Sequence, residues 1–231
     1  PMVTQPLMYK KIQQHPALSM DLPLAEHARR RKQLMRLVGA DAIVIVPSAP
    51  ERVRSNDTLY PYRQDSDFHY LSGFPEPEAV LVLVPGRGAG ETLLFCRERD
   101  PDRERWDGLR AGLEGAVDRY GVDDAYPIGD IDDILPGLIE GRSRIHYHLG
   151  RDPDFDQRLI GWVNRVRAEV RRGAVPPHEI SALGSLLHEL RLSKSRAELK
   201  LMREAVRISI AAHERAWAAT GQNEIGLLSL S

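Results

Sequence analysis

The stretch Arg54–Val84, RSNDTLYPYRQDSDFHYLSGFPEPEAVLVLV, decides the fold of this 231-residue chain. It holds three of the seven tyrosines and two of the four phenylalanines, interleaved with charged and amide side chains. Its last part, residues 79–84, is an unbroken apolar run of the kind found in buried strands. Because loops on a rigid scaffold often carry binding groups, we predict a recognition loop that leads directly into a sheet.

Strands and helices alternate on both sides of this stretch, which predicts an α/β fold. The apolar, β-branched run 42–46 is typical of a central strand, and residues 79–84 and 91–96 form a hairpin around a glycine-containing turn. Residues 144–148 alternate like a further strand, whereas residues 122–128 show no clear pattern. Apolar residues at helical spacing predict helices over 22–38, 131–139, 154–170 and 180–190, and a long helix that ends near residue 219.

The long helix begins with Ser195-Arg196-Ala197-Glu198, which has the pattern of a capping box. We expect four parts in the chain: a loosely ordered extension (1–20), a first domain (21–175), a linker helix (176–194) and the first helix of a domain that this chain does not complete (195–231).

Composition narrows the classes of function. The 32 basic and 33 acidic residues give a net charge of −1, which offers no electrostatic reason to bind nucleic acid or a membrane surface. The basic run His27–Lys32 is interpreted as a solvated helix face rather than a phosphate-binding patch. The single cysteine, Cys96, excludes an intramolecular disulfide framework and is expected to be a buried thiol. We expect a cytoplasmic protein.

The residues alone reveal no catalytic centre. His146 and His148 share one face of a predicted strand and could chelate a metal, but no third ligand is evident, so a structural pair is favoured. Ser66 lies near acidic residues and a histidine, yet adjacency in sequence does not make a catalytic triad. The chain has no nucleophile elbow, no HExxH motif and no dinucleotide fingerprint.

The stretch Arg54–Val84 resembles the N-terminal domain of the aminopeptidase P (Xaa-Pro aminopeptidase) family. The resemblance is carried by the motifs Arg54–Asp57, Tyr60–Gln64, Ser66–Phe68, Gly73-Phe74 and Glu76–Leu83. It continues in Glu104–Gly108, in His188–Ser195, which resembles the linker into the catalytic domain, and in Met202–Ala205, which resembles the first helix of that domain.

This resemblance implies an enzyme that removes an N-terminal residue when proline is the second residue of the peptide. It also implies a ribonuclease H-like mixed sheet flanked by helices, followed by the start of a pita-bread catalytic domain. That domain holds two divalent metals, usually manganese, on two aspartates, a histidine and two glutamates, and a metal-bridging hydroxide attacks the scissile carbonyl. All five ligands are expected beyond the long helix, so this chain alone is expected to hold no metal and to be inactive.

The resemblance implies that, as in bacterial members of the family, the N-terminal domain builds the oligomer, a dimer or tetramer, and forms part of the wall of the catalytic cleft in a neighbouring subunit. The matching positions here are Asp57, which could hold the free amino group of a substrate, and Trp106, which could pack against a proline ring. A turn-capping acid and a packing ring are equally weighted alternatives for these two residues. Structural roles in the motif are expected for Arg54, Tyr60, Arg63 and Asp67.

A second function, from a class other than the peptidases, is an alternative. Domains of the creatinase-like superfamily also occur as non-catalytic protein-binding modules. The five metal ligands expected downstream distinguish this alternative from the peptidase.

Overall fold

The computed structural model describes residues 22–221, so the predicted extension 1–20 and the last ten residues lie outside the described part. The chain divides into two compact units. Residues 24–193 form an α/β unit, and the described part of the second unit consists mainly of the helix α9 (Arg196–Gly221). Within residues 22–221, none of the helices combines the length and the apolar character needed to cross a bilayer.

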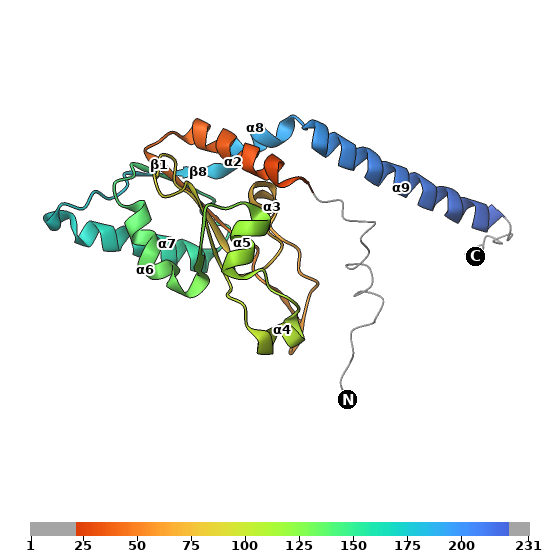
Figure 1. Cartoon of the computed structure of the whole chain (residues 1–231), viewed down its shortest axis with the longest axis horizontal. Helices are drawn as coiled ribbons and strands as arrows, with labels where there is room; N and C mark the ends of the chain where they lie inside the picture. The colour runs from red at the N-terminus through yellow and green to blue at the C-terminus, as the bar shows by residue number, and fades with distance from the viewer. Residues whose placement is uncertain (1–21, 222–231) are drawn as a thin grey trace, which may run out of the picture. The chain divides into compact units, whose positions relative to one another are not determined.

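A six-stranded mixed sheet forms the centre of the α/β unit (Figure 1). The strand order is β6-β5-β4-β1-β7-β8, with bounds β1 Ala42–Pro47, β4 Val80–Leu83, β5 Thr92–Cys96, β6 Asp124–Pro127, β7 Arg144–Tyr147 and β8 Glu179–Ala182. Only β4 is antiparallel to its neighbours, β1 and β5, and the other adjacent pairs are parallel. The five remaining strands therefore end at one edge, called here the carboxyl edge.

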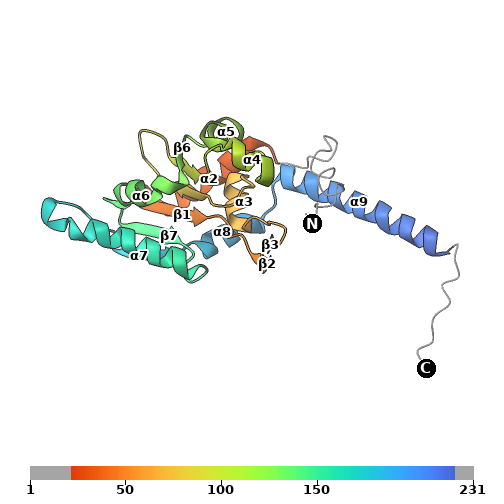
Figure 2. The ribbon, with the colours of Figure 1, turned by 90° about the horizontal axis from the view of Figure 1, so that it is seen from below.

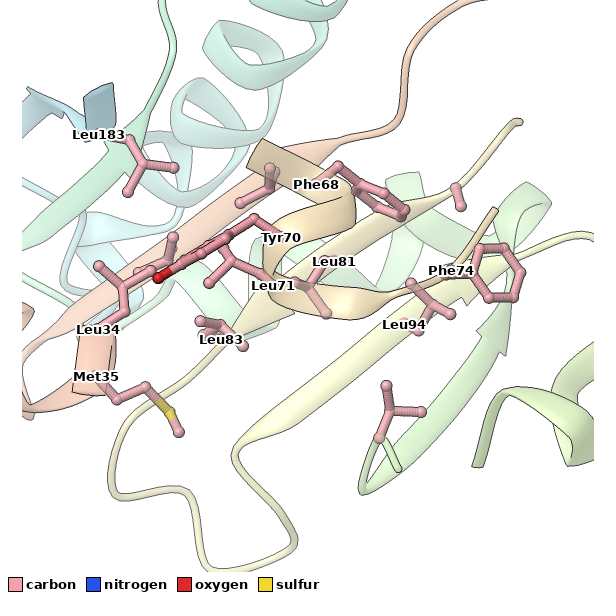
Figure 3. Close-up of a cluster of buried hydrophobic side chains, with 14 of the residues drawn as sticks. Leu34, Met35, Phe68, Tyr70, Leu71, Phe74, Leu81, Leu83, Leu94 and Leu183 are labelled. Atoms are coloured by element: carbon pink, nitrogen blue, oxygen red, sulfur yellow. The ribbon is translucent and has the colours of Figure 1, made fainter. Parts of the chain in front are cut away.

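Helices cover both faces of the sheet. One face packs against α2 (Leu24–Val38), α3 (Ser66–Ser72), α5 (Gly112–Tyr120) and α8 (Leu183–Leu192), and Figure 3 shows part of this core. The opposite face packs against α6 (Ile131–Ile139) and α7 (Pro153–Ala168). Along β1, Val44 contributes to the first core and Ile45 to the second, which explains why the run 42–46 is apolar throughout.

The sequence patterns predict most of the long elements. The central strand, the hairpin of β4 and β5, the strand at β7 and the helices α2, α6, α7 and α9 are confirmed within a few residues. The capping box is confirmed as well: the amide of Ser195 donates to the Glu198 carboxylate at 2.7 Å, and the amide of Glu198 donates to the Ser195 hydroxyl at 3.2 Å. Burial of Cys96 is also confirmed, and it raises the pKa of the thiol to about 12.

Several short elements differ from the prediction. The stretch 54–84 is not one loop, because it contains the small hairpin β2–β3 (Val53–Ser55, Thr58–Leu59) and the helix α3. The segment 122–128 contains the edge strand β6, and the unpredicted strand β8 precedes the helix predicted over 180–190, which is confirmed as α8. The remaining unpredicted elements are α4 (Pro101–Asp107), α5 and the 3₁₀ turns Ile128–Asp130 and Val170–Arg172.

The basic run at 27–32 is a solvated helix face only at Arg29 and Lys32, and the prediction was wrong for His27, Arg30 and Arg31, which are buried. Arg30 and Arg31 are only 1% and 2% exposed. The Arg30 guanidinium donates to the carbonyl of Tyr70 at 2.9 Å, and Arg31 donates to the carbonyl of Leu71 at 3.0 Å. These carbonyls belong to the last turn of α3, where the helix itself offers no N–H donors for them and where the helix dipole attracts cations.

His27, also on α2, contacts the same end of α3. Its Nδ1 lies 3.1 Å from the carbonyl of Tyr70, and burial lowers the pKa of the ring to about 4. The imidazole is therefore neutral near pH 7, and since a carbonyl can only accept, Nδ1 carries the proton. The helix α2 thus contacts the end of α3 through three polar side chains rather than through apolar packing alone.

Arg31→Lys tests this correction. Arg31 also donates to the carbonyl of Gly121 at 2.6 Å, and a lysine cannot serve both carbonyls with the same forked geometry. We expect the free energy of unfolding in urea to fall by about 1 to 3 kcal/mol. The control Arg29→Lys, at an exposed ion pair with Glu26, should change it by less than about 0.5 kcal/mol. Equal effects of the two substitutions would contradict the assignment.

Gly73→Ala tests the close approach of α2 to the end of α3. Gly73 has φ +67°, and a β-carbon there would lie 2.8 Å from Nε2 of His27. Gly150, with φ +89° and open space around it, is the matched control. Both alanine variants should lose about 1 kcal/mol through backbone strain. We expect Gly73→Ala to lose at least about 1 kcal/mol more in thermal or urea unfolding; a Gly73→Ala loss no larger than that of Gly150→Ala would rule out a tight contact.

Candidate functional site

The topology brings three polar segments to the carboxyl edge of the sheet. The chain leaves β1 into the hairpin β2–β3, leaves β5 toward α4, and leaves β7 toward α7. Since β1, β5 and β7 run in the same direction, all three segments emerge at one edge. Figure 2 shows the hairpin and α4 at the same end of the sheet. Residues 57 and 106, which the sequence analysis singled out, are both located on these segments.

Asp57 lies in the turn between β2 and β3 and is exposed to solvent. The hydroxyl of Thr58 donates to its carboxylate at 3.3 Å, and no ion pair holds it within the described residues. Nearby, the guanidinium carbon of Arg54 lies 6.0 Å from the centre of the Tyr60 ring. The carboxylate is therefore available to an external cation.

Trp106 lies in the last turn of α4 and is 82% exposed. The helix forms because Asp100 caps its first turn, accepting from the amides of Asp102 and Arg103 at 3.1 and 3.2 Å, and because Pro101 fits the first helical position. Neighbouring Leu109 is also exposed. The largely exposed indole and the exposed leucine together offer apolar surface to another molecule.

An open cleft of about 980 Å³ lies at the ends of β1 and β7. Its walls come from the chain that follows β1, from residues 60–67 before and at the start of α3, and from residues 147–154 after β7. This cavity is called here the edge cleft. It contains Arg63 and Asp67 of the predicted motif, together with residues from far along the chain.

Asp67 is the most strongly held acid of the edge cleft, with 2% exposure. Its carboxylate contacts Arg191 at 2.5 Å, Nε2 of His148 at 3.1 Å and Arg151 at 3.4 Å. The contact with the His148 ring is the largest cause that lowers the pKa of Asp67, to about 2, and the Arg191 guanidinium adds to it. One buried carboxylate thus connects α3 to α8 and to the loop after β7.

Gln64 holds the loop that precedes α3. Its amide nitrogen donates to the carbonyls of Phe74 and Glu76 at 3.2 and 2.8 Å, and its amide oxygen accepts from the backbone of Ala49 at 2.9 Å. Asp65 caps α3 by accepting from the amides of residues 67 and 68. These bonds fix the rim of the edge cleft without using the charge of Arg63, whose guanidinium donates to the Ser66 hydroxyl at 3.3 Å.

The residues that the sequence offered for catalysis or metal binding have other environments. His148 contacts Asp67, whereas His146 is buried, and burial lowers the pKa of its ring. Ser66 is the first residue of α3, and the neighbouring Asp65 is engaged as the helix cap. Within residues 22–221, no three or more histidine, cysteine, aspartate or glutamate side chains are grouped so that they could hold a metal ion.

Asp67→Asn tests the buried anchor. The folded pKa of about 2 lies below the ordinary 3.8, so the carboxylate stabilises the fold fully above pH 4 and less as the pH falls toward 2. We expect a loss of about 2 to 4 kcal/mol at pH 7 in urea unfolding, because the buried carboxylate loses its charged contacts with Arg191 and its contact with His148. The difference from wild type should shrink between about pH 4 and 2. Exposed Asp118→Asn is the control, and a pH-independent difference would contradict this account.

Comparison with known proteins finds relatives over most of the chain. Residues 27–147 match the model of "Aminopeptidase P, N-terminal domain". The Xaa-Pro aminopeptidase of Escherichia coli is 35% identical over 192 residues, which cover 83% of this chain and 44% of that protein. The rat Xaa-Pro aminopeptidase 3 is 35% identical over 225 residues, 90% of this chain and 42% of that protein.

Solved structures agree with the sequence relatives. The aminopeptidase PepP of Pseudomonas aeruginosa is 59% identical, with a TM-score of 0.83 over 85% of this chain and 45% of that chain. A zinc-substituted E. coli aminopeptidase P in complex with product is 34% identical, with a TM-score of 0.80. The chain therefore spans less than half the length of these relatives.

The mixed sheet with helices on both faces, the family model over residues 27–147 and the relatives above one third identity lead to one conclusion. The chain belongs to the aminopeptidase P family, as a member that contains its N-terminal domain.

Proposed function

We propose that this chain is the N-terminal part of a manganese-dependent Xaa-Pro aminopeptidase, and that its carboxyl edge forms part of the wall of the catalytic cleft in a neighbouring subunit. The substrate class is a peptide with proline as its second residue. The proposal is supported by the relatives, which are Xaa-Pro aminopeptidases more than twice as long as the matched region. The subunits form a homo-oligomer, a dimer or tetramer, in this proposal.

One observation supports the assignment of the wall: Asp57 on the hairpin β2–β3 and Trp106 on α4 are both exposed, and both segments follow strands that end at the carboxyl edge. The indole offers a flat apolar surface that suits a proline ring, and the carboxylate offers a negative charge that suits a peptide amino group. By contrast, the buried carboxylate of Asp67 forms an ion pair with Arg191 within the domain. The exposed pair of residues 57 and 106 is free to contact another molecule, whereas the ion pair of Asp67 stabilises the domain.

The described residues do not fit a metal centre, since none of their acidic, histidine and cysteine side chains gather in threes. We therefore assign no step through a metal to this chain. In the proposal, the manganese ions are held by residues outside the described part, and the chain alone has no peptidase activity. A cytoplasmic location completes the proposal, and the free thiol of Cys96 is compatible with that reducing compartment.

Trp106→Ala and Asp57→Asn in the longer protein test the wall. We expect kcat/KM for a peptide such as Gly-Pro-Ala to fall about tenfold or more in each variant, about 1.4 kcal/mol of lost transition-state binding. The control Leu37→Ala removes an exposed apolar side chain from α2 and should leave kcat/KM unchanged. If both variants had the kcat/KM of the wild type, the carboxyl edge would not be part of the wall of the catalytic cleft.

Mixing two kinds of subunit tests whether the wall of one subunit contributes to the catalytic cleft of its neighbour. Subunits with Trp106→Ala are combined with subunits whose catalytic half is inactivated by substitution of its metal ligands. Each parent is inactive or weak, but a hybrid oligomer pairs an intact wall with an intact metal centre. We expect activity to return after mixing, and activity that never exceeds the sum of the parents would contradict a wall shared between subunits.

A further inference from the structure

The helix α4, which carries Trp106, has little apolar attachment to the domain. Among the residues that the structure describes, neither apolar core includes one from 101–106. The side chains of Arg103 and Arg105 are 72% and 76% exposed, and Trp106 is 82% exposed. Because a helix of seven residues is not stable in isolation, contacts other than apolar packing hold α4 in place.

Glu104 is the exception within α4, since its side chain is only 6% exposed. Its carboxylate accepts from the guanidinium of Arg99 at 3.0 and 2.9 Å and from the backbone amide of Arg110 at 3.3 Å. Arg99 precedes the helix and Arg110 follows it. One carboxylate therefore binds the chain on both sides of α4, and its forked contact with the guanidinium is of the strong, charge-assisted kind.

The chain on both sides of α4 is itself fixed to the domain. The stem of Arg99 lies against the start of α5, because a β-carbon at Gly112 would be 2.5 Å from Cγ of Arg99. After α4, the amide of Ala111 donates at 2.6 Å to the carboxylate of Glu76, which lies just before β4. Glu104 thus connects the exposed helix to groups that the sheet and α5 hold.

The place of the indole depends on this attachment. Trp106 follows Glu104 by two residues, and the helix ends just after it, where the amide of Gly108 donates to the carbonyl of Glu104 at 3.2 Å. Without the contacts of the carboxylate, a helix this short opens and the indole occupies many positions. Only a fraction of the molecules then presents the indole to a ligand, and the apparent affinity falls by that fraction.

We propose that Glu104 is a positioning residue for Trp106: it binds the chain on both sides of α4 and so holds the indole in place for the substrate. The inference rests on the proposed function, in which Trp106 belongs to the wall of the catalytic cleft. Glu104 itself does not contact the substrate, so its effect on the reaction passes through Trp106 alone.

Steady-state kinetics of the longer protein with Gly-Pro-Ala test the effect on the substrate. We expect Glu104→Ala to raise KM about tenfold and to change kcat by less than about twofold. The double variant Glu104→Ala/Trp106→Ala should lose no more kcat/KM than Trp106→Ala alone. The control Glu169→Ala removes a more exposed glutamate, paired with Arg172, and should leave both constants unchanged. Losses that multiply in the double variant would overturn the proposal.

Backbone ¹⁵N relaxation of the full chain tests the positioning itself, independently of any peptidase activity. The order parameters of amides 102–108 should be near about 0.85 in the wild type and in Glu169→Ala, and below about 0.6 in Glu104→Ala. The amides of β1 and β4 should not change, which verifies the fold. Glu104→Gln keeps an oxygen acceptor, so it should show a smaller fall, and it replaces Glu104→Ala if that variant does not fold.

The two measurements distinguish the inference from the proposed function. Unchanged order in α4 of the Glu104 variants would overturn the positioning role, whatever the kinetics. A fall in order, together with wild-type kinetics in Trp106→Ala, would support the positioning role and contradict the proposed wall.

Discussion

Buried charge at both ends of the seven-residue helix α3 is the constraint on which the rest of the domain depends. At its start, the carboxylate of Asp67 accepts from Arg191 and contacts His148. At its end, the guanidinium groups of Arg30 and Arg31 donate to its last carbonyls. Negative charge at the start of a helix and positive charge at its end both complement the helix dipole.

This arrangement explains how a polar segment can lie within a core. A helix as short as α3 is not stable in isolation, because nucleation costs more than its few hydrogen bonds return. Here its partners come from α2, from the loop after β7 and from α8, so the segment is fixed by the whole domain. The apolar residues Phe68 and Leu71 then pack under the sheet in a single register.

The sequence predicts the elements whose residues repeat with one period and are long enough to show it. The run at 42–46, the hairpin 79–96 and the helix at 131–139 belong to this group. Prediction from the sequence fails where an element or a buried side chain depends on contacts with residues far away in the chain. Nothing near Arg30 or Arg31 indicates that carbonyls some forty residues later will bury them. The strand β6 is short and only partly buried, so its pattern is weak.

Some residues of the candidate site could also be predicted from the sequence, and others could not. The family motif identifies Asp57, Trp106 and Asp67, but it does not distinguish exposed residues from buried ones. The structure separates them, since Trp106 is exposed whereas Asp67 is enclosed by cations. His148, Arg151 and Arg191 could not be assigned to the edge cleft from sequence, because they reach it only through the parallel pairing of β7 and the packing of α8. The cap Asp65 and the stop Gly73 were local signals for α3 that the aromatic content of the stretch concealed.

Native-state hydrogen exchange tests most directly whether charge at its two ends holds α3 in place. The amides of His69 and Gly73 donate within α3 at 2.9 Å each, and they report its opening. If the anchors hold, these amides exchange with free energies within about 1 kcal/mol of the amides of β1 and β4, because α3 opens only when the sheet does. Exchange from α3 at several kcal/mol below the sheet would show local opening and would contradict the account.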